Sequence, residues 1–507
     1  VYGAEAGAEY YFGVHAKDLS LPQSATLVAI LNNPSNLRID QPNDKGQRAA
    51  TAADRIETLD TKGLEIHTSL DLDLQAQAQS ALSSYVPATV DGVDVGGTNV
   101  TVEPGTGRVL SMVQNTSYTQ SDNGGAGATA INYNADTAYG NSGGFQTGST
   151  YKVFTLAEWL ASGHTLSESV NTTEHTFPQS EFTNSCVRLG GDPWKVANAE
   201  SVPASMTVQA ATSESINTAF GAMAKQLDLC KIKETAQAMG IHQADGSAPD
   251  SNPASVLGTN NLSPIDLAEA YAGFANGGIV CTPTVIDSVK EADGTSITPS
   301  PSSCTRGVSQ EVAGTVDYAL QGVLTGAGTA ATANPGDSVP KFAKTGTTDG
   351  DVQNWLVTST TKYTNATWIG NVQGNVGLAN VPFPHGTTGY SAKFGVGRSM
   401  MTYLDQTLSG GALPAPDPAM IGSVAKAPSS SSSGDSTAGS AAGSASSGQG
   451  AGSTPSAPST PAAPAAGGTG AGAAAGSGSG SGSTGGGASG GGSGKGGTTG
   501  PGSGSGK

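Results

Sequence analysis

The sequence lacks any uninterrupted run of 18 or more apolar residues, so no segment of it predicts a transmembrane helix. It has no CxxC pair and no His cluster beside its cysteines, which argues against a structural zinc site. Basic residues are scarce, because 23 Lys and Arg face 40 Asp and Glu, for a formal net charge of −17. This acidic balance argues against nucleic acid or an anionic lipid surface as the main partner.

Charged and large apolar residues almost disappear after residue 426. Residues 427–507 consist almost wholly of Gly, Ser, Ala, Thr and Pro, and their only charges are Asp435, Lys495 and Lys507. Such a composition buries too little apolar surface to offset the entropy of ordering, so we predict a disordered tail, drawn at 411–507. The other end begins without methionine, and we interpret it as an internal cut in a longer parent.

Four cysteines are present, Cys186, Cys230, Cys281 and Cys304. The even number favours two disulfides and an oxidising compartment. The economical pairing joins Cys281 to Cys304 across a hairpin-like stretch, and Cys186 to Cys230. Four buried thiols in a cytosolic protein remain the alternative on cysteine count alone.

Apolar periodicity places strands near both ends of the chain body and helices between them. Residues 5–56 look helical, 64–70 alternate as a strand, and 98–114 form a hairpin bending at Pro104 and Gly105. Further strands are expected from residue 341 to 372, and a closing helix follows. This order does not fit a repeating βαβ sheet. It predicts an α+β fold with an antiparallel sheet, flanking helices and a helical lobe.

Three short motifs occur in order along this body. They are STYK at Ser149–Lys152, SIN at Ser215–Asn217 and KTG at Lys344–Gly346. Each alone is short enough to arise by chance, as a helix start, a helix cap or an edge strand. Their order and context make the set informative.

The spacing of STYK places a serine and a lysine one helical turn apart on one face. A serine hydroxyl needs a base, and a desolvated Lys152 beside a second cation, Lys344, is neutral enough to serve. In the strand KFAKTGTT, Gly346 is expected to leave room for a substrate backbone along the strand. Ser215 and Asn217 are expected to face the same cleft from a turn.

The motif set resembles that of penicillin-binding proteins and class A β-lactamases. The chain most resembles the class A, bifunctional penicillin-binding proteins, over residues 1 to about 405. Further similar stretches are IHTSLDLDLQAQAQ, VEPGTGRVLSMV, SPIDLAEAYAGFANGG, GAGTA and KTGTTDGDVQNWLV. The opening YGAEAGAEYYFG resembles the end of the family's glycosyltransferase domain. The resemblance implies a glycosyltransferase remnant at 1–56, a linker at 57–95, a transpeptidase domain at 96–410 and the tail.

The resemblance also implies roles for individual residues. Ser149 is the acylated nucleophile and Lys152 its base, while Ser215, bonded to Lys344, carries a proton to the leaving amine. Asn217 binds the donor peptide's amide, and the oxyanion hole is formed by the backbone N–H groups of Ser149 and Thr347. The expected substrate-binding residues on the KTGT strand are Thr345, Gly346 and Thr347, of which Thr345 and Thr347 hold the substrate carboxylate.

Two departures from the family pattern surround the nucleophile. Thr147 stands where the family usually has proline, and Tyr151 replaces a phenylalanine. Both leave the catalytic groups in place and bear on the geometry of the turn.

The implied activity is D,D-transpeptidation of peptidoglycan, inhibited by β-lactams, without metal or cofactor. Expected partners are stem peptides ending in D-Ala-D-Ala, and cell-division or elongation proteins. The expected location is outside the cytoplasmic membrane, to which a segment of the parent upstream of this chain is expected to be anchored. The alternatives are a D,D-carboxypeptidase, a β-lactamase and a non-catalytic penicillin sensor. Because the glycosyltransferase glutamates of the family precede residues 1–56, this chain is not expected to polymerise glycan.

Overall fold

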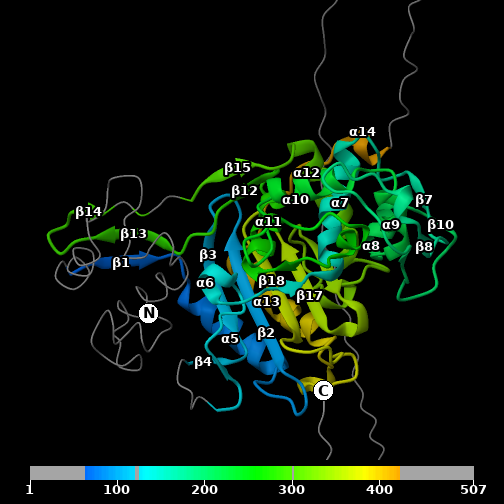
Figure 1. Cartoon of the computed structure of the whole chain (residues 1–507). Helices are drawn as coiled ribbons and strands as arrows, with labels where there is room; N and C mark the ends of the chain where they lie inside the picture. Colours follow the sequence, from blue (N-terminus) through cyan, green and yellow to red (C-terminus); the bar gives the residue numbers. More distant parts are fainter. Residues whose placement is uncertain (1–62, 120–124, 298, 300–301, 423–507) are drawn as a thin grey trace, which may run out of the picture. The chain divides into compact units, whose positions relative to one another are not determined.

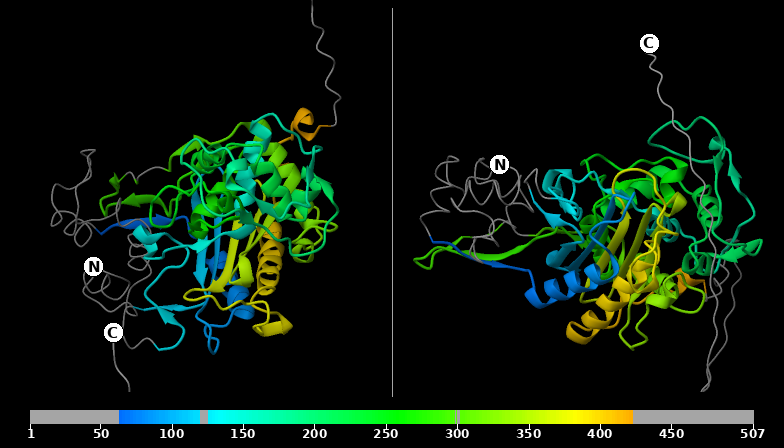
Figure 2. Two further views of the ribbon diagram at one scale, coloured as in Figure 1. Left: turned by 45° about the vertical axis from the view of Figure 1, so that its right-hand side comes forward. Right: turned by 90° about the horizontal axis from the view of Figure 1, so that it is seen from below.

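The computed structural model describes residues 63–119, 125–297, 299 and 302–422, and Figures 1 and 2 show how they are arranged. The predictions for residues 1–56 and for residues 423–507 lie outside these described residues. Within the described part, no helix combines the length and apolar character needed to cross a bilayer.

A five-stranded antiparallel sheet forms the centre, and it joins early and late parts of the chain as predicted. Hydrophobic strands from positions 95–114 pair with strands from 342–371, which confirms the α+β class. One edge strand carries the KTG motif. The strands in spatial order are β16 (Phe342–Thr347), β17 (Gln353–Ser359), β18 (Thr364–Asn371), β2 (Val95–Glu103) and β3 (Arg108–Gln114).

Two helices cover one face of this sheet, α5 (Leu72–Tyr85) and α13 (Ala392–Thr407), which Figure 2 shows side by side. The Asp71 carboxylate caps α5 by accepting hydrogen bonds from two N–H groups of its first turn. The buried stripe of α13 includes Val396, Met400 and Leu404, as the apolar spacing predicted.

The other face packs on α11 (Pro264–Ala275) and the helical lobe. Helix α11 begins as predicted, with Ser263 as N-cap and proline at its first position, and its Tyr271 and Phe274 are fully buried. The lobe contains α7 (Lys152–Ala161), α8 (Val208–Ser213), α9 (Asn217–Ala224), α10 (Leu229–Ala238) and α12 (Gln310–Gln321).

Short strands complete the described part. β1 (Glu65–Thr68) pairs with β13 (Ile286–Lys290), which pairs with β14 (Ser296–Ile297), in a separate sheet. The remaining short pairs are β4 (Ser117–Tyr118) with β5 (Ala128–Thr129), β6 (Phe145–Gln146) with β11 (Asn261–Leu262), β7 (Ser169–Asn171) with β10 (Ser205–Thr207), β8 (Thr176–Phe177) with β9 (Trp194–Lys195), and β12 (Ile279–Cys281) with β15 (Cys304–Arg306). The short helices are α6 (Thr137–Gly140) and α14 (Pro418–Ile421).

Both predicted disulfides are present. Cys281 and Cys304 lie opposite each other in the β12–β15 pair, and Cys186 is bonded to Cys230 of α10. No free cysteine remains. The alternative of four buried thiols is therefore wrong.

Two of the expected segments, the linker implied by the resemblance and the tail predicted from composition, include residues that pack in the described structure. Helix α5 lies in the segment expected as a linker at 57–95, yet its buried side chains pack with α13 and the sheet. Residues 411–422 were expected in the tail, but Met420 packs against the main core and its carbonyl accepts a hydrogen bond from Leu166 N–H. Residues of both segments therefore belong to the packed part of the chain.

Candidate active site

The nucleophile candidate Ser149 lies in a tight turn at the start of α7. Residues Gly148–Tyr151 form a 3₁₀ turn, and the α-helix begins only at Lys152. Gly148 has φ +54°, and a Cβ there would lie 2.5 Å from the carbonyl oxygen of Thr347. Glycine is therefore required both for the turn and for close approach to β16. Ser149 itself is partly exposed.

Three hydrogen bonds from distant elements fix this turn. The hydroxyl of Tyr271 on α11 donates to the carbonyl of Thr150 at 2.8 Å, inside the core. The indole N–H of Trp355 on β17 donates to Gln146 at 2.9 Å, and Gly148 N–H donates to Gly258 at 3.0 Å. The turn is thus held on the sheet although threonine replaces proline at position 147.

Lys152 points into the molecule and is fully buried. Its Nζ donates to the carbonyl of Ser215 at 2.7 Å and to Oδ1 of Asn217 at 2.6 Å, and it lies 3.3 Å from Ser215 Oγ. Burial, and then the nearby Lys344 ammonium, hold the pKa of Lys152 well below its ordinary value. Among the described residues, no hydrogen bond joins Lys152 to Ser149.

Ser215 lies between the two lysines of the motif set. Lys344 Nζ donates to Ser215 Oγ at 2.7 Å and to the carbonyl of Thr345 at 2.9 Å. Burial lowers the pKa of Lys344 to about 7. Ser215 has φ +59°, a left-handed conformation that is costly for a residue with a Cβ. The segment between α8 and α9 is held in that conformation with the hydroxyl against both lysines.

Asn217 is the first residue of α9, and both ends of its amide are engaged. Its oxygen accepts from Lys152, and its Nδ2 donates to the carbonyl of Ala197 at 2.7 Å. The structure therefore brings together four of the predicted catalytic and binding residues, namely Lys152, Ser215, Asn217 and Lys344.

The KTGT strand β16 is an edge strand beside the nucleophile turn. Thr348 N–H donates to the carbonyl of Gln353 on β17. In an antiparallel ladder, hydrogen-bonded and non-hydrogen-bonded residue pairs alternate. The preceding residue Thr347, opposite Asn354, therefore directs its N–H away from β17. Thr345 Oγ1 contacts Thr329 Oγ1 at 2.6 Å. Thr347 Oγ1 donates to the carbonyl of Gly346 at 2.8 Å.

The prediction for Gly346 was wrong in its physical reason. A Cβ at this position would lie 2.3 Å from the carbonyl oxygen of Thr147 and 2.9 Å from the Thr150 methyl. The space beside the glycine is therefore filled by the nucleophile turn and is not left for a substrate. The sequence showed that a close approach was needed, but not by which segment.

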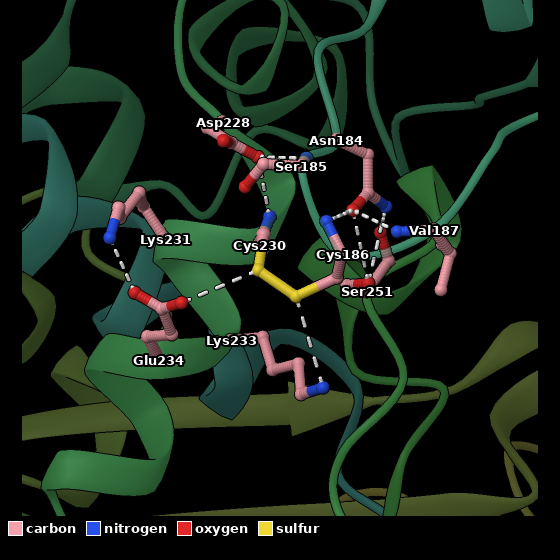
Figure 3. The surroundings of a disulfide bond; sticks show 10 residues. All are labelled: Asn184, Ser185, Cys186, Val187, Asp228, Cys230, Lys231, Lys233, Glu234 and Ser251. Atoms are coloured by element: carbon pink, nitrogen blue, oxygen red, sulfur yellow. Dashed lines mark hydrogen bonds and ion pairs between the residues drawn. A yellow bond between two sulfur atoms is a disulfide. The ribbon is translucent and has the colours of Figure 1, made fainter.

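Residues 172–204 form a loop, here called the rim loop, that contacts the SIN segment. Its Ala197 carbonyl holds the amide of Asn217. Figure 3 shows how the same loop is attached at Cys186, through the disulfide to Cys230 and through Asn184 Nδ2, which donates to Ser251 at 2.7 Å. The disulfide thus restrains the loop that supports Asn217.

Sequence reasoning missed Lys393, a third buried lysine at this site. It lies on α13, and its Nζ donates to Thr347 Oγ1 at 2.9 Å and approaches the carbonyl of Gly346 at 3.3 Å. It precedes Val396, Met400 and Leu404 at helical spacing, so it belongs to the buried stripe. The sequence feature that could have identified this residue is a lysine within the otherwise apolar stripe of the closing helix.

Residues 97–379, more than half of the chain, match the family model described as "Penicillin binding protein transpeptidase domain". Residues 1–57 match the "Transglycosylase" model. Curated relatives include penicillin-binding protein 1A of Mycobacterium tuberculosis, 26% identical over 63% of this chain and 37% of the relative. Penicillin-binding protein 2a of Streptococcus pneumoniae is 26% identical over 73% of this chain and 56% of the relative. The chain thus spans between about a third and somewhat over half of these relatives.

Solved structures with the same fold include the penicillin-binding protein PonA1 of Mycobacterium tuberculosis. It matches with a TM-score of 0.56 and 24% identity, over 71% of this chain and 90% of that one. Penicillin-binding protein 1A of Haemophilus influenzae matches with a TM-score of 0.56 and 15% identity, over 82% of this chain and 84% of that one. At these identities the similarity establishes the fold.

Proposed function

Because the chain belongs to the penicillin-binding protein transpeptidase family, we propose that it is a serine D,D-transpeptidase that cross-links peptidoglycan stem peptides. The observation that carries the proposal is the convergence of two fully buried lysines, Lys152 and Lys344, on the hydroxyl of Ser215. Buried cations without carboxylate partners are costly, and they are retained where protons are moved.

Lys152 is suited to be the base that activates Ser149. Its two short hydrogen bonds go to carbonyl-type oxygens, which accept only, and a neutral amine has two N–H donors to satisfy them. The remaining lone pair is free to accept the serine proton. The lowered pKa of Lys152 increases the population of this neutral form at pH 7.

Acylation then proceeds by attack of Ser149 Oγ on the carbonyl carbon of the penultimate D-Ala. The O–C bond forms as Lys152 accepts the hydroxyl proton, and the N–H groups of Ser149 and Thr347 stabilise the oxyanion. The C–N bond to the terminal D-Ala breaks, and its amine takes a proton relayed through Ser215. An acceptor amine attacks the ester and restores the serine hydroxyl. In a β-lactam the broken C–N bond belongs to the ring, so the amine stays tethered and the ester persists.

A D,D-carboxypeptidase is the second candidate, because it differs only in passing the acyl group to water. A β-lactamase or a penicillin sensor is less well supported, since the match of residues 1–57 to a transglycosylase model favours a cell-wall synthase. We propose that this chain acts outside the cytoplasmic membrane, where the cell wall is assembled. The two disulfides support it. Residues 1–56 are proposed to be a glycosyltransferase remnant.

The decisive experiment is labelling with a fluorescent penicillin, followed by mass spectrometry of the labelled peptide. We expect one adduct at Ser149 and none in Ser149→Ala. Lys152→Ala and Lys344→Ala are expected to slow labelling at least ~100-fold while remaining folded. Lys362→Ala, which changes an exposed lysine, is the matched control.

Labelling of the Ser149→Ala protein would refute the assignment of the nucleophile. A second assay supplies a donor peptide ending in D-Ala-D-Ala with an acceptor amine and quantifies the two products. Cross-linked product supports transpeptidation, whereas release of free acid alone favours the carboxypeptidase.

A further inference from the structure

Lys393 is a buried cation that the mechanism above does not use. Its side chain is 0% exposed, and among the described residues no carboxylate lies within 4.0 Å of its Nζ. Its surroundings are Thr347 Oγ1, the Gly346 carbonyl and two aromatic rings, of Tyr390 with the centroid at 4.1 Å and of Phe394 at 5.2 Å. These direct contacts satisfy donors, and none of them is with a carboxylate, although the more distant Asp351 acts on Lys393 through its charge.

Another lysine in the same fold shows how a buried cation is normally neutralised. Lys341, which directly precedes β16 and is almost fully buried, contacts carboxylate oxygens of Asp337 and Asp405, both at 2.6 Å. An uncompensated buried charge costs several kcal/mol in general. Lys393 has no such contact in the described chain, so its positive charge is available to act on an anionic ligand nearby.

Lys393 contacts Thr347, one of the two threonines that the resemblance assigns to the substrate carboxylate. Thr347 is partly exposed and lies at the end of the KTGT strand, while Lys393 lies behind it. The Gly346 carbonyl accepts from Thr347 Oγ1 at 2.8 Å and is 3.3 Å from Lys393 Nζ. When the threonine hydroxyl turns to a ligand, Lys393 keeps that carbonyl satisfied. Its donation to Thr347 Oγ1 also makes the hydroxyl a stronger donor to an anion.

We propose that Lys393 is a positioning residue that orients and polarises Thr347 for the carboxylate at the end of the donor peptide and of β-lactams. The inference rests on the proposed function, because it assigns the carboxylate of the same substrates to this end of the cleft. Lys393 acts through Thr347 and through its charge, without touching the substrate.

The experiment uses two donor substrates that differ by one charge. One is an N-benzoyl-D-alanyl thioester of mercaptoacetate, whose leaving group bears a carboxylate, and the other is the methyl ester of that carboxylate. Thiol release with D-alanine as acceptor gives kcat/KM for each. All four cysteines are in disulfides, so the released thiol is titrated without a protein background.

We expect Lys393→Gln, which keeps a donor but removes the charge, to lower kcat/KM for the carboxylate about tenfold and to leave the ester within twofold. A tenfold change corresponds to about 1.4 kcal/mol. The matched control is Arg398→Gln, which removes one positive charge from an exposed position on the same helix. That variant is expected to keep the parent's ratio of carboxylate to ester.

A second measurement needs no variant and applies if Lys393→Gln does not fold. Burial lowers the pKa of Lys393 to about 7, Asp351 opposes that effect, and Lys344 adds to it. The cation is lost as pH rises through this range, so the parent's carboxylate-to-ester ratio is expected to fall between pH 6 and 8.5. Lys344 titrates in the same range, and Tyr390 faces Lys393 as well. A flat ratio in the parent contradicts the inference without any variant. Where Lys393→Gln does fold, the part of the fall that disappears in it reports Lys393.

Equal losses for both substrates in a folded variant would mean that Lys393 only supports β16, and would overturn the inference. An unchanged ratio in Lys393→Gln, or a flat ratio across pH in the parent, would overturn it too. If the parent forms no acyl-enzyme at Ser149 with either substrate, the proposed function fails and the inference falls with it. If the parent is acylated at Ser149 but Lys393→Gln leaves the carboxylate-to-ester ratio unchanged, only the inference about Lys393 fails and the proposed function stands.

Discussion

Ser215 combines a strained backbone with a hydroxyl between two buried lysines, so substitutions there separate stability from chemistry. Its φ of +59° is unfavourable for a residue with a Cβ and acceptable for glycine. Ser215→Ala and Ser215→Gly both remove the hydroxyl that lies 2.7 Å from Lys344 Nζ. They differ only in the Cβ, so their comparison measures the backbone conformation.

The expected magnitudes follow from these contacts. The left-handed conformation destabilises the folded state of a non-glycine residue by about 1–2 kcal/mol. Glycine avoids that cost, but its greater freedom in the unfolded state lowers the stability of the glycine variant by about 0.5–1 kcal/mol. Ser215→Gly is therefore expected to exceed Ser215→Ala in unfolding free energy by about 0.5–1 kcal/mol. Both variants lose the same proton relay, so both are expected to acylate ~100-fold or more slowly than the parent.

Two assays test this pair. Urea unfolding followed by tryptophan fluorescence gives stability, and the time course of fluorescent-penicillin labelling gives the acylation rate. Ser213→Ala is the matched control, because its hydroxyl donates only to the Gln209 carbonyl one turn earlier. Acylation of Ser215→Ala within threefold of the parent would refute the relay. An alanine variant as stable as the glycine variant would refute the strain.

Three further predictions concern stability. Removing the Cys281–Cys304 disulfide, which closes a loop with a sequence separation of 23, is expected to cost about 3 kcal/mol in a denaturant titration, and an unchanged midpoint would contradict this. Thr147 has a buried hydroxyl without a partner in the described chain, so Thr147→Val is expected to raise the unfolding free energy by about 1 kcal/mol, and a lower value would count against the unpaired hydroxyl. The hydrogen bond that His242 Nε2 donates to the Asp136 carboxylate raises the pKa of His242 to about 9, so its stabilisation is complete below about pH 6.5 and lost as pH rises through 9. His242→Gln is therefore expected to lower stability at pH 6, by less than about 1 kcal/mol because the side chain is a third exposed, and to match the parent at pH 10.

Local patterns in the sequence were sufficient for much of the fold. Apolar patterns and turn residues predicted the strands of the central sheet, and the Ser263 cap with proline after it predicted the start of α11. These features depend on residues close in sequence, so they can be read directly. The pairing of Cys281 with Cys304 was predictable for the same reason, because a short hairpin brings them together.

The sequence by itself thus determined the class of fold, the disulfide pairing and the ordered motifs that define the candidate site. Only the tertiary structure decided that Gly346 accommodates the nucleophile turn, that Ser215 is held in a left-handed conformation and that Lys393 lies behind Thr347. Each of these depends on packing between segments tens to hundreds of residues apart, where side-chain volume and burial decide the contacts. A short motif specifies the chemical groups, whereas the burial that shifts the pKa of Lys344 and Lys393 to about 7 arises only when sheet and helices close around them.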